Sequence, residues 1–356
     1  MGTYSFASGP ATLPPEVVAS VGADIARRDR ASRSLLELPF TSREFTAILD
    51  QAEDDLRQLL ALPADYRILF LQGGASAHFA LVPMNLLGVQ HRADYVETGL
   101  WSRRAIEQAR PHAEVGICAS GNLVSLPAPD TWRSSKGAAY CHFTSNETAD
   151  GLQFHSWPEP AEAPFVVDMS ADLLTRPIPM ERLGLVYASA QKNLGAAGLT
   201  LAVIRADLLG KARAGTPTPF DYTRQAAGRS KVNTPPMMAI AVAARMLRWI
   251  RDQGGVGIME QRNRSRSGRL YAAIDRSGLY SCPIAPLDRS MLNVRFQLPT
   301  PGDDERFLHE AEEAGLYDLR GHVAVGGIRA SLYNAMTDAA VEALIDFMAD
   351  FERRRG

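Results

Sequence analysis

Lysine is scarce in this sequence, which makes the few lysines informative. Of the 38 basic residues in the 356-residue chain, only Lys136, Lys192, Lys211 and Lys231 are lysines. Arginine supplies the positive charge everywhere else. A guanidinium does not lose its proton at neutral pH and cannot form an imine with an aldehyde. A lysine that persists in such a chain is therefore a candidate for chemistry that arginine cannot perform.

Cysteine is almost absent. The three cysteines, Cys118, Cys141 and Cys282, are odd in number and far apart in the sequence. The sequence contains no Cys-x-x-Cys pair and no Cys/His cluster with the spacing of a metal site. This pattern argues against a disulfide framework, predicts no metal centre and is typical of thiols in a reducing compartment.

The chain also lacks a basic excess and long apolar runs. Its net charge is −2 and its pI is near 6.4, so we expect no nucleic-acid partner. The longest apolar runs, such as residues 237–244, are too short to cross a bilayer, so we expect no membrane association. Residues 1–5 show neither the basic nor the apolar part of a signal peptide. Together these absences predict a cytoplasmic protein.

The composition that remains is that of a globular protein with a sizeable core. Apolar residues make up 46% of the chain and charged residues 22%. Short apolar runs alternate with amphipathic stretches, which predicts an α/β fold with a largely parallel sheet. The length exceeds that of a typical single domain. We expect residues 1–254 to form an N-terminal arm and a large domain, and residues 255–356 a smaller C-terminal α+β domain.

Periodicity and turn residues locate the expected elements. Helices are predicted over residues 14–25, 42–60, 77–87, 101–109, 207–214, 235–253, 257–277, 305–314 and 338–354. Strands are predicted over residues 67–71, 138–143, 165–167, 185–188, 199–204, 291–298 and 323–332.

Two of these strands are followed by residues that suit one cofactor. Asp168 comes directly after residues 165–167, and Lys192 follows the strand at 185–188. The carboxyl ends of neighbouring parallel strands meet at one edge of a sheet. Pyridoxal 5'-phosphate (PLP) needs a lysine for its aldehyde and a carboxylate that keeps its pyridine nitrogen protonated. Taken alone, Asp168 fits a turn or a helix cap better than a cofactor contact, because Asp is common after strands.

The other lysines have less suitable settings. Lys136 lies in a polar loop, Lys211 lies in the predicted exposed helix at 207–214, and Lys231 precedes a pair of prolines. Lys192 is therefore the candidate for the imine.

Two further features suit the same cofactor. Gly73 and Gly74 stand between a strand and a helix, followed by Ala75 and Ser76. Small residues there let backbone N–H groups approach a phosphate, although a Gly-Gly turn is also an ordinary strand–helix connection. Trp101 at the start of a predicted helix could stack on a cofactor ring or belong to the core.

These residues are part of a longer, collinear series of motifs. It comprises Phe6-Ala7-Ser8-Gly9-Pro10-Ala11, Gly73-Gly74-Ala75-Ser76, Ala93-Asp94-Tyr95-Val96, Gly99 and Trp101, Asn146-Glu147-Thr148, Ala190-Gln191-Lys192-Asn193, Asn233-Thr234-Pro235-Pro236, Met291-Leu292-Asn293-Val294, Gly321-His322, and Gly326-Gly327-Ile328-Arg329-Ala330-Ser331. With this series the chain resembles phosphoserine aminotransferase, a family of class V PLP enzymes with aminotransferase fold type I.

The resemblance implies a role for each matched position. Lys192 would carry the cofactor as a Schiff base, and Asp168 would bind the pyridine nitrogen. Further cofactor contacts would be Ala75 and Ser76 at the phosphate, Trp101 on the ring, Thr148 at the ring hydroxyl, Gln191, and Asn233 and Thr234 reaching in from a neighbouring subunit. Arg329 would hold the substrate α-carboxylate, with Ser8 nearby. The implied assembly is a homodimer, and the implied substrates are an L-amino acid and a 2-oxo acid.

Two positions depart from the family pattern. The family usually shows Ser-His-Arg before the second helix, and here Phe40 and Thr41 stand at the histidine and arginine positions. Near the C-terminus the family usually shows Gly-His-Arg, and here Val323 follows His322. The resemblance implies that those arginines hold the substrate phosphate, and losing a buried ion-pair partner costs about 3–5 kcal/mol.

The departures lead to three alternatives. The first is an aminotransferase with a less basic distal pocket at Thr41 and His322, acting on a substrate other than 3-phosphohydroxypyruvate. The second is an ordinary phosphoserine aminotransferase that uses L-glutamate, in which Arg43 or Arg320 compensates. The third is a catalytically silent PLP-binding protein, against which the α-carboxylate arginine Arg329 argues.

Overall fold

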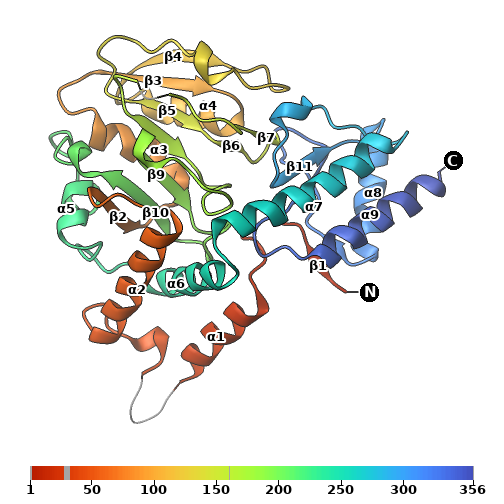
Figure 1. The fold of residues 1–356 in the computed structure, drawn as a ribbon, viewed down its shortest axis with the longest axis horizontal. Helices are drawn as coiled ribbons and strands as arrows, with labels where there is room; N and C mark the ends of the chain where they lie inside the picture. Colours follow the sequence, from red (N-terminus) through yellow and green to blue (C-terminus); the bar gives the residue numbers. More distant parts are fainter. Residues whose placement is uncertain (1, 28–32, 160, 356) are drawn as a thin grey trace.

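The computed structural model describes residues 2–27, 33–159 and 161–355 (Figure 1). The helices are α1 (Pro15–Ala26), α2 (Arg43–Leu59), α3 (Gly74–Leu86), α4 (Leu100–Ala109), α5 (Tyr222–Ala227), α6 (Met237–Asp252), α7 (Val256–Arg276), α8 (Pro301–Glu313) and α9 (Asp338–Arg353). The strands are β1 (Tyr4–Ser5), β2 (Tyr66–Leu71), β3 (Arg92–Glu97), β4 (Glu114–Ser120), β5 (Cys141–Thr144), β6 (Asn146–Glu147), β7 (Leu152–Gln153), β8 (Phe165–Asp168), β9 (Leu183–Ser189), β10 (Thr200–Arg205), β11 (Asn293–Phe296), β12 (Leu316–Tyr317) and β13 (Ile328–Ser331).

A mostly parallel sheet forms the centre of the molecule. Within the described ranges it has seven strands in the order β2-β10-β9-β8-β5-β3-β4. Only β10 runs antiparallel to its neighbours, β2 and β9. The α/β fold with a largely parallel sheet is confirmed. Because β5, β8 and β9 are parallel neighbours, Thr144, Asp168 and Ser189 end their strands at one edge.

Helices cover both faces of this sheet, because side chains alternate between the faces along each strand. Val167 and Val186 point to the face covered by α2 and α6, whereas Val166 and Tyr187 point to the face covered by α3 and α4. The helix α2 illustrates the local signals. Ser42 accepts a hydrogen bond from Phe45 N at 3.1 Å, and the helix buries one apolar side.

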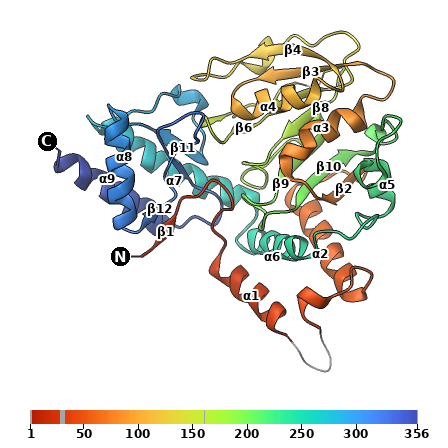
Figure 2. The ribbon, with the colours of Figure 1, turned by 180° about the vertical axis from the view of Figure 1, so that it is seen from behind.

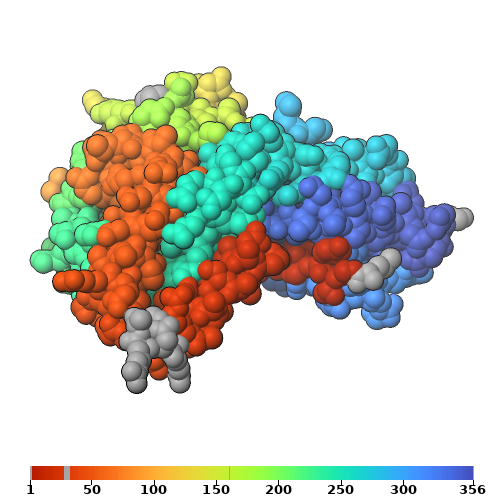
Figure 3. All heavy atoms as spheres, turned by 60° about the horizontal axis from the view of Figure 1, so that its bottom comes forward, coloured from red at the N-terminus to blue at the C-terminus, as the bar shows by residue number. Residues whose placement is uncertain are grey.

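The C-terminal elements form a second core beside the sheet. The small sheet β11–β13 packs with α7, α8 and α9, and the N-terminal Phe6 is buried among them. Strand β1 pairs with β12, so the N-terminal arm lies against the C-terminal elements (Figure 2). Figure 3 shows the same arm (red) along α6 and α7 (teal) and the C-terminal residues (blue).

Gly254 and Gly255 separate α6 from α7. Both have positive φ, 103° and 80°, a conformation that favours glycine. The division into domains at this point stays a prediction. The start of α7 still belongs to the core of the large sheet through Met259, and, apart from Phe6, the second core begins at Leu270.

Some predicted elements differ from the structure. The helix expected at 207–214 is wrong, because only a 3₁₀ turn at Ala206–Leu208 forms before Gly210 takes a φ of 81°. Lys211 therefore lies in a loop. Strands β3 and β4 and the short helix α5 were not predicted.

Candidate active site

A cavity of about 410 Å³ opens at the carboxyl edge of the central sheet. It lies at the ends of β5, β8 and β9, between the first turns of α3 and α4 and the strand β13. Its lining consists of Ser8, Gly9, Gly73, Gly74, Ala75, Ser76, Trp101, Thr144, Asn146, Thr148, Asp168, Ser170, Ser189, Gln191, Lys192, His322 and Arg329. Sheet topology thus brings residues that are far apart in the sequence to one place.

Lys192 presents its amine inside this cavity. Its Nζ donates a hydrogen bond to Thr148 Oγ1 at 2.6 Å and lies 5.8 Å from the centre of the Trp101 ring. Burial lowers the pKa of Lys192 to about 8, and the negative charge of Asp168 opposes that shift. The amine is therefore much closer to its neutral, nucleophilic form at physiological pH than an exposed lysine.

Asp168 lies on the floor of the cavity. It is the last residue of β8, it is only 4% exposed, and its Oδ1 accepts a hydrogen bond from Ser170 N at 2.9 Å. Burial raises the pKa of Asp168, while Ser170 and Lys192 act in the opposite direction. A protonated pyridine nitrogen beside this carboxylate would favour its charged form.

The N-terminus of α3 supplies a place for a phosphate. Gly73 precedes the helix with a φ of 104°, and no side chain caps the first turn. The free N–H groups of that turn and the helix dipole favour an anion. A Cβ at Gly73 would stand 2.6 Å from Ala77 Cβ, which explains the glycine.

Three polar atoms around the cavity lack a partner among the described residues. They are Trp101 Nε1, Thr144 Oγ1 and Arg329 Nε, and each is buried. Buried polar atoms normally form hydrogen bonds. Unpartnered donors around a lysine, an aspartate and a helix N-terminus are what a polar cofactor and an anionic substrate require, so the residues present fit PLP.

Arg329 stands on the opposite side of the cavity, on β13. Its Nη2 donates to Ser8 Oγ at 2.7 Å and its Nη1 to Thr148 O at 3.4 Å. No carboxylate pairs with it within the described ranges. Burial lowers the pKa of Arg329, which nevertheless remains charged at neutral pH. A buried guanidinium without a counter-ion is suited to receive a carboxylate from a substrate.

His322, Trp101 and Arg104 cluster at the mouth. The rings of Trp101 and His322 meet edge to face at 6.0 Å, and the Arg104 guanidinium lies 5.0 Å from the centre of the Trp101 ring. Burial, then Arg329 and Arg104, lower the pKa of His322, so this residue is neutral at physiological pH. The neighbouring Val323 is 96% exposed and does not line the cavity.

The remaining predicted site residues lie outside the cavity. Thr41 is exposed and outside the cavity lining. Asn233 and Thr234 are also exposed, and Thr234 O accepts a hydrogen bond from Gln72 Nε2 at 2.9 Å. Arg320 is held in an exposed ion pair with Glu305.

Sequence reasoning missed several contributors. Thr144, Ser170 and Ser189 line the cavity only because their strand ends converge, so no local pattern marks them. Glu147 belongs to a quoted motif, but only its neighbour Thr148 was given a role. Its carboxylate contacts the start of α4, which no sequence spacing reveals.

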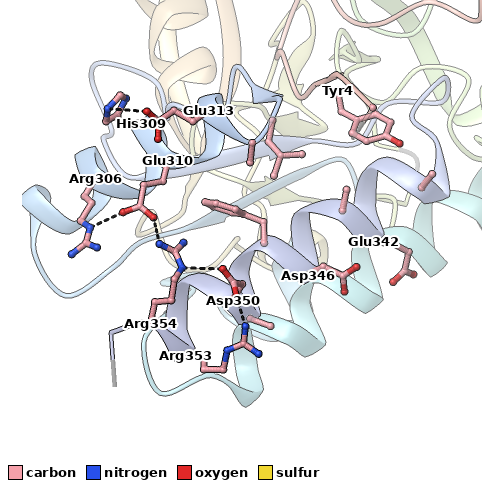
Figure 4. Close-up of a pocket in the computed structure, with 17 residues that line it drawn as sticks. Tyr4, Arg306, His309, Glu310, Glu313, Glu342, Asp346, Asp350, Arg353 and Arg354 are labelled. Carbon is pink, nitrogen blue, oxygen red and sulfur yellow. Dashed lines mark hydrogen bonds and ion pairs between the residues drawn. The ribbon is translucent and has the colours of Figure 1, made fainter.

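A larger cavity of about 1490 Å³ lies between α8 and α9 (Figure 4). Several of its charged side chains pair with one another: Glu310 contacts Arg306 and Arg354, and Arg354 contacts Asp350. It contains no lysine. Size alone therefore does not mark the active site.

Among the described residues, no group of three or more His, Cys, Asp or Glu residues is placed to hold a metal ion. No helix in this part of the chain is long and apolar enough to cross a membrane.

Comparison with known proteins identifies the chemistry. The class V aminotransferase family model matches residues 3–344. The chain belongs to the class V aminotransferases. It is 47% identical over 356 residues to the phosphoserine aminotransferase of Azotobacter vinelandii, with 99% of each chain covered.

Solved structures of phosphoserine aminotransferases are also similar to this chain over their full length. The phosphoserine aminotransferase of Bacillus circulans subsp. alkalophilus has a TM-score of 0.97 and 38% identity, covering 100% of this chain and 99% of that one. The PLP-bound phosphoserine aminotransferase of Trichomonas vaginalis has a TM-score of 0.94 and 34% identity, covering 98% and 100%. The resemblance to this family, fold type I and the PLP cofactor are confirmed, and the protein is a PLP-dependent transaminase.

Proposed function

We propose that this transaminase is an ordinary phosphoserine aminotransferase, moving an amino group between L-glutamate and 3-phosphohydroxypyruvate. The observation that carries the proposal is the 47% identity to a phosphoserine aminotransferase, which extends over 99% of both chains. This is the second of the alternatives raised by the sequence, and the similarity supports it better than the altered-substrate alternative.

Each residue of the cavity would have its own role in the reaction. When bound, PLP supplies an aldehyde that takes the amino group and a ring that withdraws electrons. Asp168 would hold the proton on the ring nitrogen, and the first turn of α3 at Ala75 and Ser76 would hold the phosphate. Lys192, once freed by the substrate amine, would take the proton from the substrate Cα as general base and, as general acid, would deliver it to the cofactor carbon that bears the nitrogen. Arg329 would bind the α-carboxylate and Trp101 would cover the ring.

One observation favours the altered-substrate alternative. Arg329 is the only arginine that lines the described cavity, and Arg320 is already paired with Glu305. Under the main proposal a second cation must reach the substrate phosphate. Arg104 at the mouth is a candidate, because it has no ion-pair partner in the described parts of the chain and lies over Trp101. Arg43 is the other, as the exposed first residue of α2.

A half-reaction screen separates the two substrate proposals. The purified enzyme with bound PLP is mixed with L-phosphoserine, L-glutamate or a panel of neutral amino acids, and the loss of its long-wavelength absorbance is followed. Fast conversion by phosphoserine supports the ordinary enzyme. If phosphoserine gives no conversion and another amino acid does, the proposal of an ordinary enzyme is contradicted. Faster phosphoserine conversion by a Thr41→Arg/Val323→Arg variant would support the altered pocket, whereas equal turnover would count against it.

We further propose a homodimer in which each subunit completes its neighbour's site. Asn233 and Thr234 are exposed and lie outside the cavity of their own subunit, so a contact with the cofactor requires a second copy. Light scattering after gel filtration tests the assembly.

Mixed dimers test the shared site. Lys192→Ala and Asn233→Ala/Thr234→Ala subunits should each be inactive or weak alone. The two are unfolded and refolded together. If the pair acts across the interface, mixed dimers contain one intact site, and activity returns to roughly a quarter of the parent value for statistical pairing. No recovery would mean that the pair acts within its own subunit, and full activity of the Asn233→Ala/Thr234→Ala enzyme alone would mean that the pair does not act at the site.

A further inference from the structure

The helix α4 begins without a capping side chain of its own. Its N-cap residue is Gly99, and the first backbone N–H groups of a helix have no partner within it. Trp101, the aromatic residue over the cavity, lies in this first turn. Whatever satisfies these N–H groups also determines where the Trp101 ring stands.

Two carboxylates from another segment satisfy them. Glu147 Oε2 accepts a hydrogen bond from Trp101 N at 2.8 Å, and Glu147 Oε1 accepts from Ser102 N at 2.9 Å and Thr98 Oγ1 at 3.1 Å. Asp150 Oδ2 accepts from Leu100 N at 3.0 Å. The helix dipole favours negative charge at this end.

The contact is close, and the glycine makes it possible. A Cβ at Gly99 would stand 2.6 Å from Asp150 Oδ2 and 2.7 Å from Glu147 Cδ. Glu147 is 1% exposed. Burial, then the neighbouring Asp150, raise the pKa of Glu147 to about 7. Burying this carboxyl group is unfavourable, and its hydrogen bonds to three donors offset that cost.

The segment that carries Glu147 also contacts the reactive groups. The next residue, Thr148, accepts a hydrogen bond from Lys192 Nζ through its hydroxyl and from Arg329 Nη1 through its carbonyl. Residues 147–150 therefore join the start of α4 to the lysine and to the arginine. A shift of this segment relative to α4 would change the distance between the Trp101 ring and Lys192.

We infer that Glu147 is a positioning residue that holds the Trp101 ring against the cofactor, through its hydrogen bonds to the first turn of α4. The inference rests on the proposed stacking role of Trp101. Asp150 supports the same turn through Leu100. Neither carboxylate lines the cavity, so they act through the helix and not by touching the cofactor.

The test compares Glu147→Gln in two backgrounds of the full-length holoenzyme. A glutamine side chain keeps the size but offers one acceptor oxygen to three donors. In the parent, the substitution should raise the PLP dissociation constant about five- to ten-fold, which corresponds to the loss of one aromatic stacking contact. The visible circular dichroism of the bound cofactor should fall. In a Trp101→Ala background, Glu147→Gln should leave the PLP dissociation constant nearly unchanged. It should still lower the melting temperature of the apoenzyme, because the backbone N–H of residue 101 still needs an acceptor.

The control is Asp304→Asn in the C-terminal part. Asp304 Oδ1 accepts a hydrogen bond from Leu298 N at 2.9 Å, and the residue is remote from the cavity lining. This variant should lower stability without changing the PLP dissociation constant or the dichroism.

Two results would overturn the inference. One is an equal change in the PLP dissociation constant in both backgrounds, which would show that Glu147 acts independently of Trp101. The other is an unchanged constant in Glu147→Gln or in Trp101→Ala. Neither result affects the substrate proposal, because conversion of phosphoserine in the half-reaction screen decides that separately.

Discussion

Replacing Arg329 should separate substrate recognition from stability. Its partners in the described structure are neutral oxygens of Ser8 and Thr148, so its charge has no counter-ion until a substrate arrives. A guanidinium binds a carboxylate through two charge-assisted hydrogen bonds, each worth about 2 kcal/mol. Arg329→Met removes both, so kcat/KM for the amino-acid half-reaction should fall roughly 1000-fold at about 1.4 kcal/mol per decade. Arg329→Lys keeps the charge but loses the planar pair of donors, so its kcat/KM should fall roughly 30-fold.

The same substitution should have little effect on folding. A buried charge without a partner destabilises the folded state, so Arg329→Met should keep the substrate-free enzyme within about 1 kcal/mol of the parent, or make it more stable. Arg266 is a matched control, because it is 5% exposed and its Nε lies 3.3 Å from Asp338 Oδ1. Arg266→Met should lower stability and leave the half-reaction unchanged.

Two measurements check this reasoning. Stopped-flow loss of the cofactor absorbance against amino-acid concentration gives kcat/KM, and urea unfolding gives the free energy of unfolding. Parent-like kcat/KM in Arg329→Met would refute the assignment of the α-carboxylate site. A loss of more than about 3 kcal/mol of stability would refute the view that the charge is uncompensated.

Three further predictions concern the rest of the site. Lys192→Ala should still bind PLP, as measured by equilibrium dialysis, but transamination should fall by at least about 10⁴-fold because the proton at Cα then has no shuttle; substantial residual turnover would contradict this. Because burial lowers the pKa of Lys192 to about 8, the rate at which apoenzyme recovers the visible absorbance with added PLP should rise with pH up to about 8 and then level off; a continued rise towards pH 10 would indicate an ordinary lysine. Gly99→Ala should lower the free energy of unfolding by about 1–3 kcal/mol, because the added Cβ would stand 2.6 Å from Asp150 Oδ2. Thermal melts check this, with Gly257→Ala near the start of α7 as the control, because a Cβ there meets nothing within 4 Å.

Local signals explain which elements could be predicted. The helices α2, α6 and α9 have strong apolar periodicity, and Ser42 and Thr337 mark the starts of α2 and α9. Strand β3 was missed because the charged Asp94 interrupts its apolar pattern. In the structure Asp94 is fully buried, and it accepts a hydrogen bond from Ser135 N at 2.5 Å. This contact from a distant segment, together with Arg92 Nε at 3.8 Å from Asp94 Oδ1, stabilises the carboxylate inside the sheet.

The sequence by itself predicted the pair Asp168 and Lys192. Both residues follow buried strands, and parallel neighbours bring such positions to one edge, so the order of residues along the chain was sufficient for this prediction. Gly73 and Gly74 before Ala75 supported the same prediction through a short segment, and the scarcity of lysine supported it through the composition. These are local or compositional signals, and they need no knowledge of how distant segments pack.

The tertiary structure decided the rest of the site. Arg329 meets Ser8 because β13 and the N-terminal arm both belong to the C-terminal core, 321 positions apart in the sequence. Glu147 meets Trp101 because the segment after β5 folds onto the start of α4. Such contacts depend on strand order and on the packing of separate elements, which no local pattern encodes. The mouth of the cavity likewise depends on how loops from both cores meet, which is why the substrate was the part that the sequence left open.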